Sequence, residues 1–371
     1  MRDQPLGRFG SRQTNVSFQR YSGETVRVLV TGSEGYIGSV LVLLLQGAGH
    51  EVVGLDTCYF SNRNFLGPVA EHELIKVDVR DVEMKLLEGF DAICHLAALS
   101  NDPAGELEPG ITEDINYRGT LSIAKKAKEA GVGRFVFSGS CSMYGAGDTS
   151  CYLTEDAPFN PVTAYGLSKV RAERELSRLA DQYFSPVFLR NATACGVSPR
   201  LRLDLVVNNL VALAFTTGRV AMTSDGTPWR PIAHVRDICL AFKCAIEAPR
   251  PVVHNQAFNI GRNEANYQIV DIAGIVGTFF PESTITFGKK VGEEPDSRTY
   301  RVNFEKANQY LPGFSPMYTI EDGAKELAES YQEFSLKEEH LYGEEYITIN
   351  RYKRLLEAGL IGPDFRWKDP P

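Results

Sequence analysis

The chain has 371 residues, of which 43% are hydrophobic and 23% charged, as is typical of globular proteins. Its formal net charge of −8 argues against a nucleic-acid-binding protein, because such a protein would present a basic surface. No apolar stretch approaches the roughly 20 residues that a membrane-spanning helix needs, so no membrane partner is expected.

The N-terminal stretch, the cysteines and the histidines indicate where the protein works and whether it binds a metal. Residues 1–25 contain arginines but no apolar segment, which predicts a flexible polar arm rather than a secretion signal. The seven cysteines form no Cys-x-x-Cys pair, which favours reduced thiols and a cytoplasmic location. The histidines show none of the spacings of zinc sites, so we expect no metal.

The first predicted element is a buried strand over 26–31, which runs into Gly32, Gly35 and Gly38 and then into an apolar helix. Such a glycine turn leaves unpaired amides at the start of the helix, and these bind anions such as a pyrophosphate. A second strand, 51–56, ends in Asp56, where a dinucleotide-binding fold places the carboxylate that accepts the ribose hydroxyls. The two signals together predict a dinucleotide site rather than an ordinary strand-to-helix turn.

Strands and helices alternate along the rest of the chain. The predicted strands cover 74–79, 90–98, 133–138, 187–190 and 256–260, and the predicted helices cover 112–130, 163–183, 205–216, 267–278 and 320–334. This alternation predicts an α/β fold with a Rossmann-type doubly wound parallel sheet. Residues 344–358 have helical periodicity and, with the aromatic residues that follow, are expected to pack on the body.

Polar and small side chains follow the carboxyl ends of the predicted strands, where ligands of parallel sheets bind. Asp78 is either an ordinary acid at a strand end or, with Val79, a flank for a nucleotide base. Ala97 and Ala98 leave room for a cofactor, whereas His95 is expected to be a packed core histidine.

A polar cluster ends the strand over 133–138 and is followed by a Tyr–Lys pair. Ser138, Ser140 and Ser142 form the cluster. Tyr165 and Lys169 lie four positions apart, on one face of the next helix. Such a pair is common on protein surfaces, but its place one loop after the serines favours a functional site.

Taken together, these motifs resemble those of the extended short-chain dehydrogenase/reductase superfamily, in its nucleotide-sugar epimerase/dehydratase branch. The resemblance covers residues 26–327 and rests on the stretches 31–38, 78–79, 95–98, 140–145, 165–169, 189–190 and 230–235. It implies NAD as cofactor and a smaller C-terminal α/β substrate domain beside the Rossmann-type domain. On this basis we assign 26–190 to the NAD-binding domain, with 230–260 returning to it, and 191–229 and 261–371 to the substrate-binding domain. The implied NAD-binding residues are Gly32, Gly35, Tyr36, Ile37, Gly38, Asp56, Asp78, Val79, Leu96, Ala97, Ala98, Ser138, Tyr165 and Lys169. Asp56 favours NAD over NADP because its carboxylate would repel a 2′-phosphate.

The resemblance also implies that Ser140, Tyr165 and Lys169 act together in catalysis. Tyr165 would take a proton from a sugar hydroxyl while a hydride leaves the adjacent carbon, and Ser140 would hydrogen-bond the same oxygen. A phenol with a pKa of about 10 is a poor base at neutral pH. We therefore expect the Lys169 ammonium and a positively charged nicotinamide to lower the pKa of Tyr165.

The residues after Ser140 depart from part of this branch. Its dehydratases place an Asp-Glu pair there and its decarboxylases a Glu at the second position, whereas this chain has Cys141 and Ser142. Loss of water or CO₂ by the usual route is therefore disfavoured. Cys141 stands one position before the cysteine of the reductase-epimerases, and we expect it to be a packed side chain.

What remains is an NAD-dependent nucleotide-sugar epimerase that acts through a transient 4-keto-sugar and resembles the UDP-galactose 4-epimerases. The alternatives are a keto-sugar reductase, a sugar-nucleotide dehydrogenase or a dehydratase of the same family. A more remote alternative is a non-catalytic NAD-binding regulator, although such proteins usually lack the tyrosine or the lysine.

For the substrate, the resemblance implies a nucleotide-diphosphate sugar. Arg230 and Arg298 resemble arginines that hold the diphosphate, with a solvated surface position as an equal alternative for Arg298. Thr193 stands where many relatives carry an asparagine, and Ser140 and Ser142 complete the implied substrate-binding set. A loop over 101–108 is expected to shape the sugar pocket, and its acids suit hydroxyls or an amino sugar better than a uronate. Relatives commonly form homodimers through the helices predicted over 112–130 and 163–183.

Overall fold

The structure is a computed structural model and describes residues 25–60, 65, 71–100, 102–147, 149–288 and 298–369. The predicted N-terminal arm lies outside these ranges except for Thr25. Among the described residues, no helix combines the length and the hydrophobicity that crossing a membrane requires.

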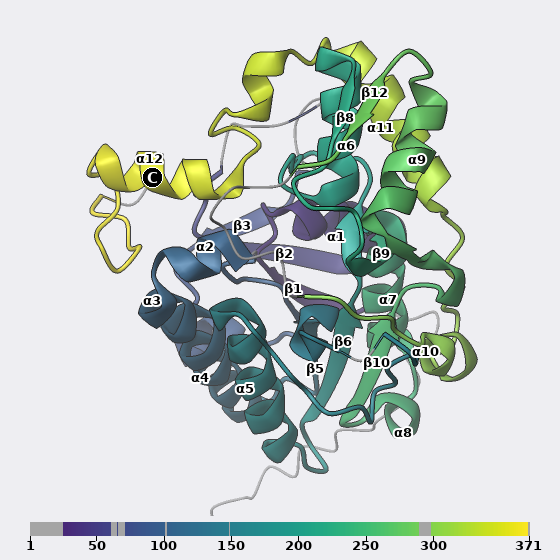
Figure 1. Cartoon of the computed structure of the whole chain (residues 1–371). Helices are drawn as coiled ribbons and strands as arrows, with labels where there is room; N and C mark the ends of the chain where they lie inside the picture. Colours follow the sequence, from purple (N-terminus) through teal and green to yellow (C-terminus); the bar gives the residue numbers. More distant parts are fainter. Residues whose placement is uncertain are drawn as a thin grey trace, which may run out of the picture.

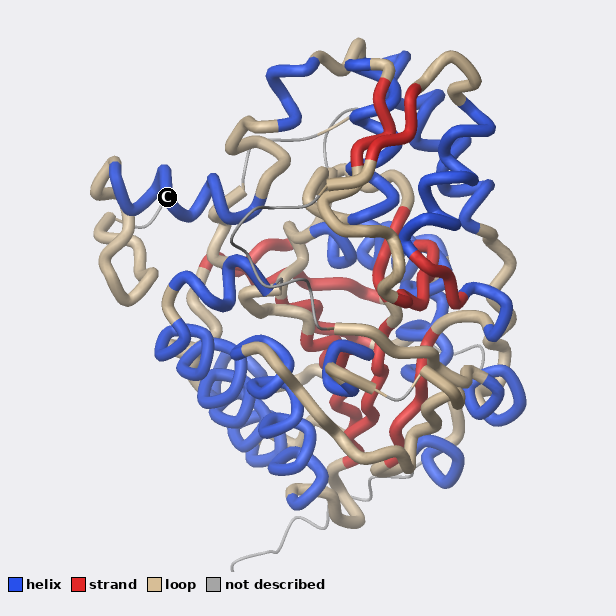
Figure 2. Tube along the Cα trace, in the orientation of Figure 1, coloured by secondary structure: helices blue, strands red, loops and turns tan. Residues whose placement is uncertain are grey.

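A seven-stranded sheet of order β10-β6-β5-β4-β1-β2-β3 forms the centre of the described chain (Figures 1 and 2). Its strands are β1 (Arg27–Thr31), β2 (Glu51–Asp56), β3 (Glu73–Lys76), β4 (Ala92–His95), β5 (Arg134–Ser140), β6 (Ser185–Asn191) and β10 (Gln256–Ile260). Neighbouring strands are parallel throughout. The strand order reverses beside β1, which is where doubly wound sheets bind their ligands. The predicted Rossmann-type fold is confirmed.

Helices cover both faces of this sheet because residues on its strands alternate between them. Val28 and Val30 of β1 pack with α1 (Tyr36–Gly47) and α7 (Val235–Glu247) on one face. Leu29, which lies between them, packs with α4 (Thr120–Glu129) and α5 (Ala164–Arg178) on the other. Figure 1 shows α4 and α5 side by side on the outside of the molecule.

Smaller sheets lie beyond the carboxyl ends of the central strands. One contains β7 (Thr193–Cys195), β9 (Trp229–His234) and β11 (Asn266–Gln268), and the other pairs β8 (Arg219–Ala221) with β12 (Thr284–Thr286). Their main helices are α6 (Val206–Thr217), α9 (Ile269–Phe279) and α11 (Ile320–Phe334), which share one apolar core. The division of the chain into two domains at the predicted boundaries stays a prediction.

The remaining helices are short. The α-helices are α2 (Asp102–Leu107), α3 (Pro109–Glu113), α8 (Arg250–Val253), α10 (Glu305–Tyr310) and α12 (Thr348–Glu357). A π-helical turn covers Asp114–Gly119, and 3₁₀ turns cover Met84–Leu87, Cys141–Tyr144, Asn263–Ala265 and Glu338–Leu341. The C-terminal residues pack on the body as expected, with Leu355 and Phe365 fully buried in the core on the α4 side.

Several predicted elements differ from the structure, including the helix predicted over 163–183, which ends at Arg178. The predicted loop over 101–108 contains helix α2, and Pro109 then begins α3. A proline is tolerated at the first position of a helix because the amide there needs no partner within the helix. The predicted helix over 112–130 is consequently divided into α3, the π-helical turn and α4. The predicted strand over 90–98 shortens to β4 because its partner β1 ends at Thr31, opposite His95.

Candidate active site

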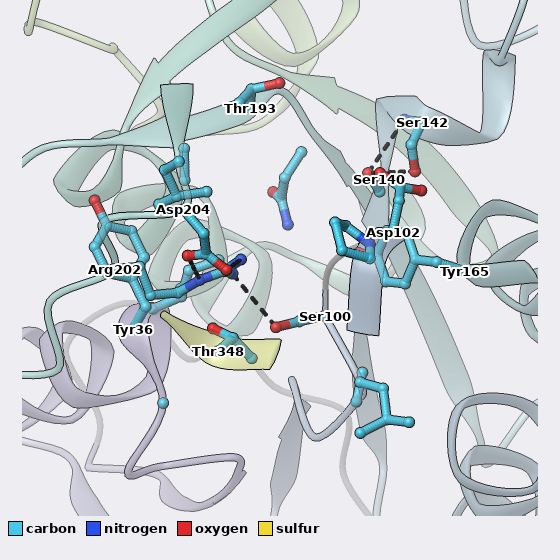
Figure 3. A pocket seen from close by; sticks show the side chains of 18 of the residues that line it. Tyr36, Ser100, Asp102, Ser140, Ser142, Tyr165, Thr193, Arg202, Asp204 and Thr348 are labelled. Atoms are coloured by element: carbon cyan, nitrogen blue, oxygen red, sulfur yellow. Dashed lines mark hydrogen bonds and ion pairs between the residues drawn. The ribbon is translucent and has the colours of Figure 1, made fainter. Parts of the chain in front are cut away.

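A cavity of about 660 Å³ lies at the carboxyl ends of the central strands, between them and the smaller sheets. The strand-end residues of β1, β2, β4, β5 and β6 form one wall, and residues from β7, β8, β9 and the loop before α6 form the other. Figure 3 shows this arrangement, with Ser140 and Tyr165 on one side and Tyr36, Arg202 and Asp204 on the other.

The glycine turn after β1 makes a close-fitting cradle at one end of the cavity. Gly32 has φ of +75°, and its amide donates to the carbonyl oxygen of Leu55 at 2.7 Å. A Cβ on Gly38 would lie 2.0 Å from the carbonyl oxygen of Gly32, so only glycine lets α1 approach this closely. Helix α1 begins at Tyr36 without a side-chain cap, and Gly35, Tyr36 and Ile37 line the cavity. Free amides at such a helix start suit a pyrophosphate.

Asp56 ends β2 beside this cradle. Its Oδ2 accepts a hydrogen bond from the amide of Glu34 at 3.1 Å, and its Oδ1 accepts one from the amide of Cys58 at 2.7 Å. Desolvation raises the pKa of Asp56 although these hydrogen bonds oppose the shift. The carboxylate lines the cavity and is held in a fixed orientation, as an acceptor for ribose hydroxyls would be.

Asp78 and Val79 also line the cavity, but the predicted strand over 74–79 ends at Lys76. Arg80 donates to both carboxylate oxygens of Asp78, from Nε at 2.9 Å and from Nη2 at 2.6 Å. Asp78 is therefore more than a solvated strand-end acid, and a contact from it to a nucleotide base stays a prediction. Leu96, Ala97 and Ala98 line the cavity between the ends of β1 and β5.

Lys169 is almost fully buried beneath the cavity, with 2% of its surface exposed. Its Nζ donates to the carbonyl oxygen of Ser138 at 2.9 Å and lies 4.8 Å from the centre of the Phe137 ring. Desolvation lowers the pKa of Lys169 to about 7. Asn191, which sequence reasoning missed, lines the cavity here and donates to the hydroxyl of Ser138 at 3.1 Å.

Ser140, Ser142 and Tyr165 share one wall (Figure 3). The Ser142 hydroxyl donates to Oγ of Ser140 at 2.9 Å, and Ser140 in turn forms a hydrogen bond with Tyr165. Tyr165 is partly exposed to the cavity and stands at the start of α5, which Thr163 caps by accepting from the amide of Gly166.

The pKa of Tyr165 is raised, which corrects one expectation. Desolvation raises it, and the hydrogen bond to Ser140 and the charge of Arg202 oppose the shift only in part. Lys169 does not supply the expected lowering: its Nζ lies 5.8 Å from the centre of the Tyr165 ring, and its own charge is penalised by burial. The protein's own groups therefore keep the phenol protonated at neutral pH.

Three further predicted substrate-binding residues belong to the same cavity. Thr193 on β7, Arg230 on β9 and Arg298 all line it. Arg298 is not a solvated surface residue, because its guanidinium pairs with the carboxylate of Asp102 at the start of α2. Arg230 is 8% exposed, and its Nη1 donates to the backbone carbonyls of Trp229 and Arg298.

Cys141 is a packed side chain, as expected. It is 1% exposed, and its Sγ donates to the carbonyl oxygen of Arg190 at 3.2 Å. Burial raises the pKa of its thiol, so it is not a reactive thiolate.

Sequence reasoning missed two further groups around the cavity. Arg202 and Asp204 form a forked ion pair at 2.9 and 3.0 Å, with side chains that are 11% and 14% exposed. The only signal in the sequence was the pair of arginines at 200 and 202. It was not enough to assign a role, because the stretch around them has neither helical nor strand periodicity. Thr348 and Tyr352 line the cavity from the C-terminal region, and no local pattern indicates this placement.

The chain is similar in sequence and structure to known NAD-dependent epimerases and related enzymes. A sequence profile of the NAD dependent epimerase/dehydratase family matches residues 28–261. A UDP-glucose 4-epimerase of Mycolicibacterium smegmatis is 30% identical over 322 residues, which span 83% of this chain and 99% of the relative. A UDP-glucose 4-epimerase of Lactobacillus helveticus is 28% identical over 292 residues, or 73% of this chain and 87% of the relative. The solved structure of MoeE5 in complex with UDP-glucose and NAD is similar with a TM-score of 0.70 and 25% identity, covering 83% of this chain and 99% of that one.

Proposed function

Because this enzyme belongs to the NAD-dependent epimerase/dehydratase family, we propose that it is a nucleotide-sugar 4-epimerase that acts through a transient 4-keto-sugar. The observation that carries the proposal is the meeting of Ser140, Tyr165 and Lys169 at one wall of a cavity. The dinucleotide cradle and the arginines at 230 and 298 line the same cavity.

The cradle fits NAD. Gly32 and Gly38 allow the close backbone approach that a pyrophosphate needs, and Asp56 presents an oriented carboxylate for ribose hydroxyls. Asn191 Oδ1 is buried and has no hydrogen-bond partner within the described chain, which leaves an acceptor for a polar ligand group near Ser138. Bound NAD would supply a hydride acceptor and later donor for the sugar carbon, and a positive charge that favours the phenolate of Tyr165.

The chain's own residues then handle the proton. Tyr165 accepts the proton of the sugar 4-hydroxyl and returns it when the inverted centre is reduced. Ser140, held by the hydroxyl of Ser142, donates to the same oxygen as it becomes a carbonyl. Lys169 orients the strand end through Ser138 and adds a positive charge whenever it is protonated.

The neighbourhood of Ser140 supports epimerisation over elimination. Cys141 is buried away from the cavity and Ser142 carries no ionisable group, so neither supplies the acid that a dehydratase uses there. The carboxylate beside this wall, Asp102, is already paired with Arg298 and with the hydroxyl of Thr163.

We propose that the substrate is a uridine- or thymidine-diphosphate hexose. Arg230 and Arg298, which both line the cavity, offer guanidinium groups that suit phosphate oxygens. Thr193, Ser140 and Ser142 add hydroxyl groups toward the sugar. The relatives named UDP-glucose 4-epimerase support a neutral hexose.

The decisive experiment incubates the purified protein with a panel of nucleotide sugars. NMR would follow the configuration at C4, and absorbance of the reduced nicotinamide would follow the cofactor. Inversion at C4 without net NADH is expected. Stoichiometric NADH would instead establish a dehydrogenase, loss of water a dehydratase, and inertness to every sugar with intact NAD binding a regulator.

Assembly and location extend the proposal. Leu167 on α5 is 41% exposed, and α4 and α5 form an outer layer in Figure 1, which supports homodimer formation through these helices. Light scattering after size-exclusion chromatography tests the dimer.

The seven cysteines form no disulfide, which supports a reducing compartment such as the cytoplasm as the location of this protein. A nucleotide-sugar epimerase there would act in carbohydrate metabolism.

A further inference from the structure

We propose that residues 344–369, here called the C-terminal strap, form part of the NAD site and slow the release of NAD. The strap lies outside the family match at 28–261. The inference rests on the proposed function only for the identity of the nucleotide, and its test measures NAD itself.

The strap is tied to the loop that directly follows Asp56. Trp367 donates from Nε1 to the carbonyl oxygen of Thr57 at 2.6 Å. Arg351 donates from Nε to the carbonyl oxygen of Tyr59 at 2.7 Å, and the Tyr59 hydroxyl donates to the carbonyl of Phe365. Two separate parts of the strap, at Arg351 and at 365–367, therefore hold the loop that follows Asp56.

Aromatic side chains from the strap and the body form a wall at this end of the cavity. The ring of Tyr352 lies 5.7 Å from that of Tyr59 and 5.5 Å from that of Phe365, and Trp367 lies 5.6 Å from Tyr59. Tyr59 and Tyr352 both line the cavity. Such a wall excludes water from the adenosine end, where a planar base has apolar faces to bury.

An ion pair and a hydrogen bond fasten the strap at the edge of the sheet. Arg366 pairs with Asp81 at 2.8 Å, and Arg80 donates to the carbonyl oxygen of Asp364 at 2.9 Å. Arg80 also holds the carboxylate of Asp78, so one guanidinium joins the strap to a predicted cofactor-binding residue.

The strap also positions the opposite wall. Its Glu345 carbonyl accepts from Arg200 at 3.0 Å, and its Tyr346 carbonyl accepts from the amide of Leu203 at 2.9 Å. These bonds hold the loop that carries the Arg202–Asp204 pair. Figure 3 shows Thr348 of the strap on the same side of the cavity as Arg202 and Asp204.

A nucleotide bound at Asp56 is therefore enclosed by a segment that joins the cavity from the far end of the chain. Release requires the strap to give up several hydrogen bonds and its aromatic packing together. A redox-neutral epimerase uses the same NAD in every cycle, so slow release is compatible with turnover.

The test measures the rate at which NAD leaves the loaded protein. Tyr352→Ala opens the aromatic wall, and Tyr342→Ala, at a position that is 68% exposed just before the strap, is the matched control. Protein loaded with NAD is desalted into buffer that contains an enzyme that consumes free NAD, and retained NAD is followed over time. We expect release about tenfold faster from Tyr352→Ala and unchanged from Tyr342→Ala. Unchanged release from a folded Tyr352→Ala protein overturns the proposal.

Hydrogen exchange on the unmodified chain guards against a variant that fails to fold. Adding NAD to the NAD-free protein is expected to slow amide exchange in α12 but not in α10, which does not line the cavity. Equal exchange in α12 with and without NAD overturns the proposal. A protein that retains NAD through the strap but inverts no sugar would leave this inference standing and overturn only the proposed function.

Discussion

Lys169 donates a hydrogen bond from Nζ to the carbonyl oxygen of Ser138 at 2.9 Å, although only 2% of the residue is exposed. Burial makes the charged ammonium unfavourable and lowers its pKa to about 7, against about 10.5 in the unfolded chain. Above pH 7 the folded chain therefore binds fewer protons at this position than the unfolded chain does. This difference makes stability depend on pH.

The first prediction concerns that dependence. Since the unfolded state holds the extra proton, the free energy of unfolding of the NAD-free protein should rise by about 2 kcal/mol from pH 7 to pH 9 through Lys169 alone. Denaturant unfolding of the unmodified protein and of Lys169→Met at both pH values isolates the contribution of Lys169 to this change in unfolding free energy. An equal change in both proteins would show that Lys169 keeps its ordinary pKa.

The second prediction concerns Tyr165. Tyr165→Phe removes the proton acceptor and should lower the turnover of a nucleotide sugar by roughly 10²- to 10⁴-fold, with NAD binding retained. Tyr183→Phe is the control, because Tyr183 is 62% exposed beyond the same helix. Steady-state kinetics measures both variants. Turnover of Tyr165→Phe at the control's rate would remove this phenol from the mechanism.

The third prediction separates the two serines. Ser140→Ala should reduce kcat by about 10²-fold because it removes the donor to the developing carbonyl oxygen. Ser142→Ala should have a smaller effect on kcat, since the Ser142 hydroxyl acts on the reacting oxygen by orienting Ser140, to which it donates at 2.9 Å. Measured kcat values in the reverse order would make Ser142 the direct contact.

The fourth prediction concerns cofactor choice at Asp56. Asp56→Asn should weaken NAD binding by about tenfold and strengthen NADP binding, because it removes an acceptor and the repulsion of a 2′-phosphate. Glu51→Gln, at the exposed start of the same strand, should change neither affinity. Isothermal titration calorimetry with both nucleotides measures the two affinities. An unchanged ratio of the NAD and NADP affinities in Asp56→Asn would contradict the prediction.

The fifth prediction concerns the diphosphate. Arg298→Lys keeps the charge but loses the guanidinium fork, so KM for the nucleotide sugar should rise by roughly tenfold while NAD affinity stays constant. Arg301→Lys is the control on the same segment: Arg301 lies 4.0 Å from the Tyr152 ring centre and does not line the cavity. A fall in kcat at constant KM would point to catalysis instead of binding.

The glycine turn and the Tyr–Lys pair were predictable because their geometry is local. A Cβ on Gly38 would clash with the carbonyl oxygen of Gly32, only six positions earlier, so this turn excludes it whatever the rest of the chain does. Tyr165 and Lys169 share a helix face by spacing alone. The alternation of apolar strands and helices likewise predicted the Rossmann-type sheet, which the strand order confirms.

Other features depended on residues far apart in the chain. Asp102 meets Arg298 across 196 positions, and no periodicity relates them. The pKa of Tyr165 was expected to fall through the charges of Lys169 and of a bound nicotinamide, whereas the surroundings that the chain itself supplies raise it. Desolvation is a property of the assembled surroundings, and here it outweighs the charge.

The sequence by itself determined the fold class, the cradle and the residues around Ser140, because short-range backbone and spacing constraints specify them. Only the tertiary structure decided what encloses them. The Tyr59 hydroxyl meets the carbonyl of Phe365 across 306 positions. Contacts of that separation arise from the packing of the whole chain, which local sequence patterns do not encode.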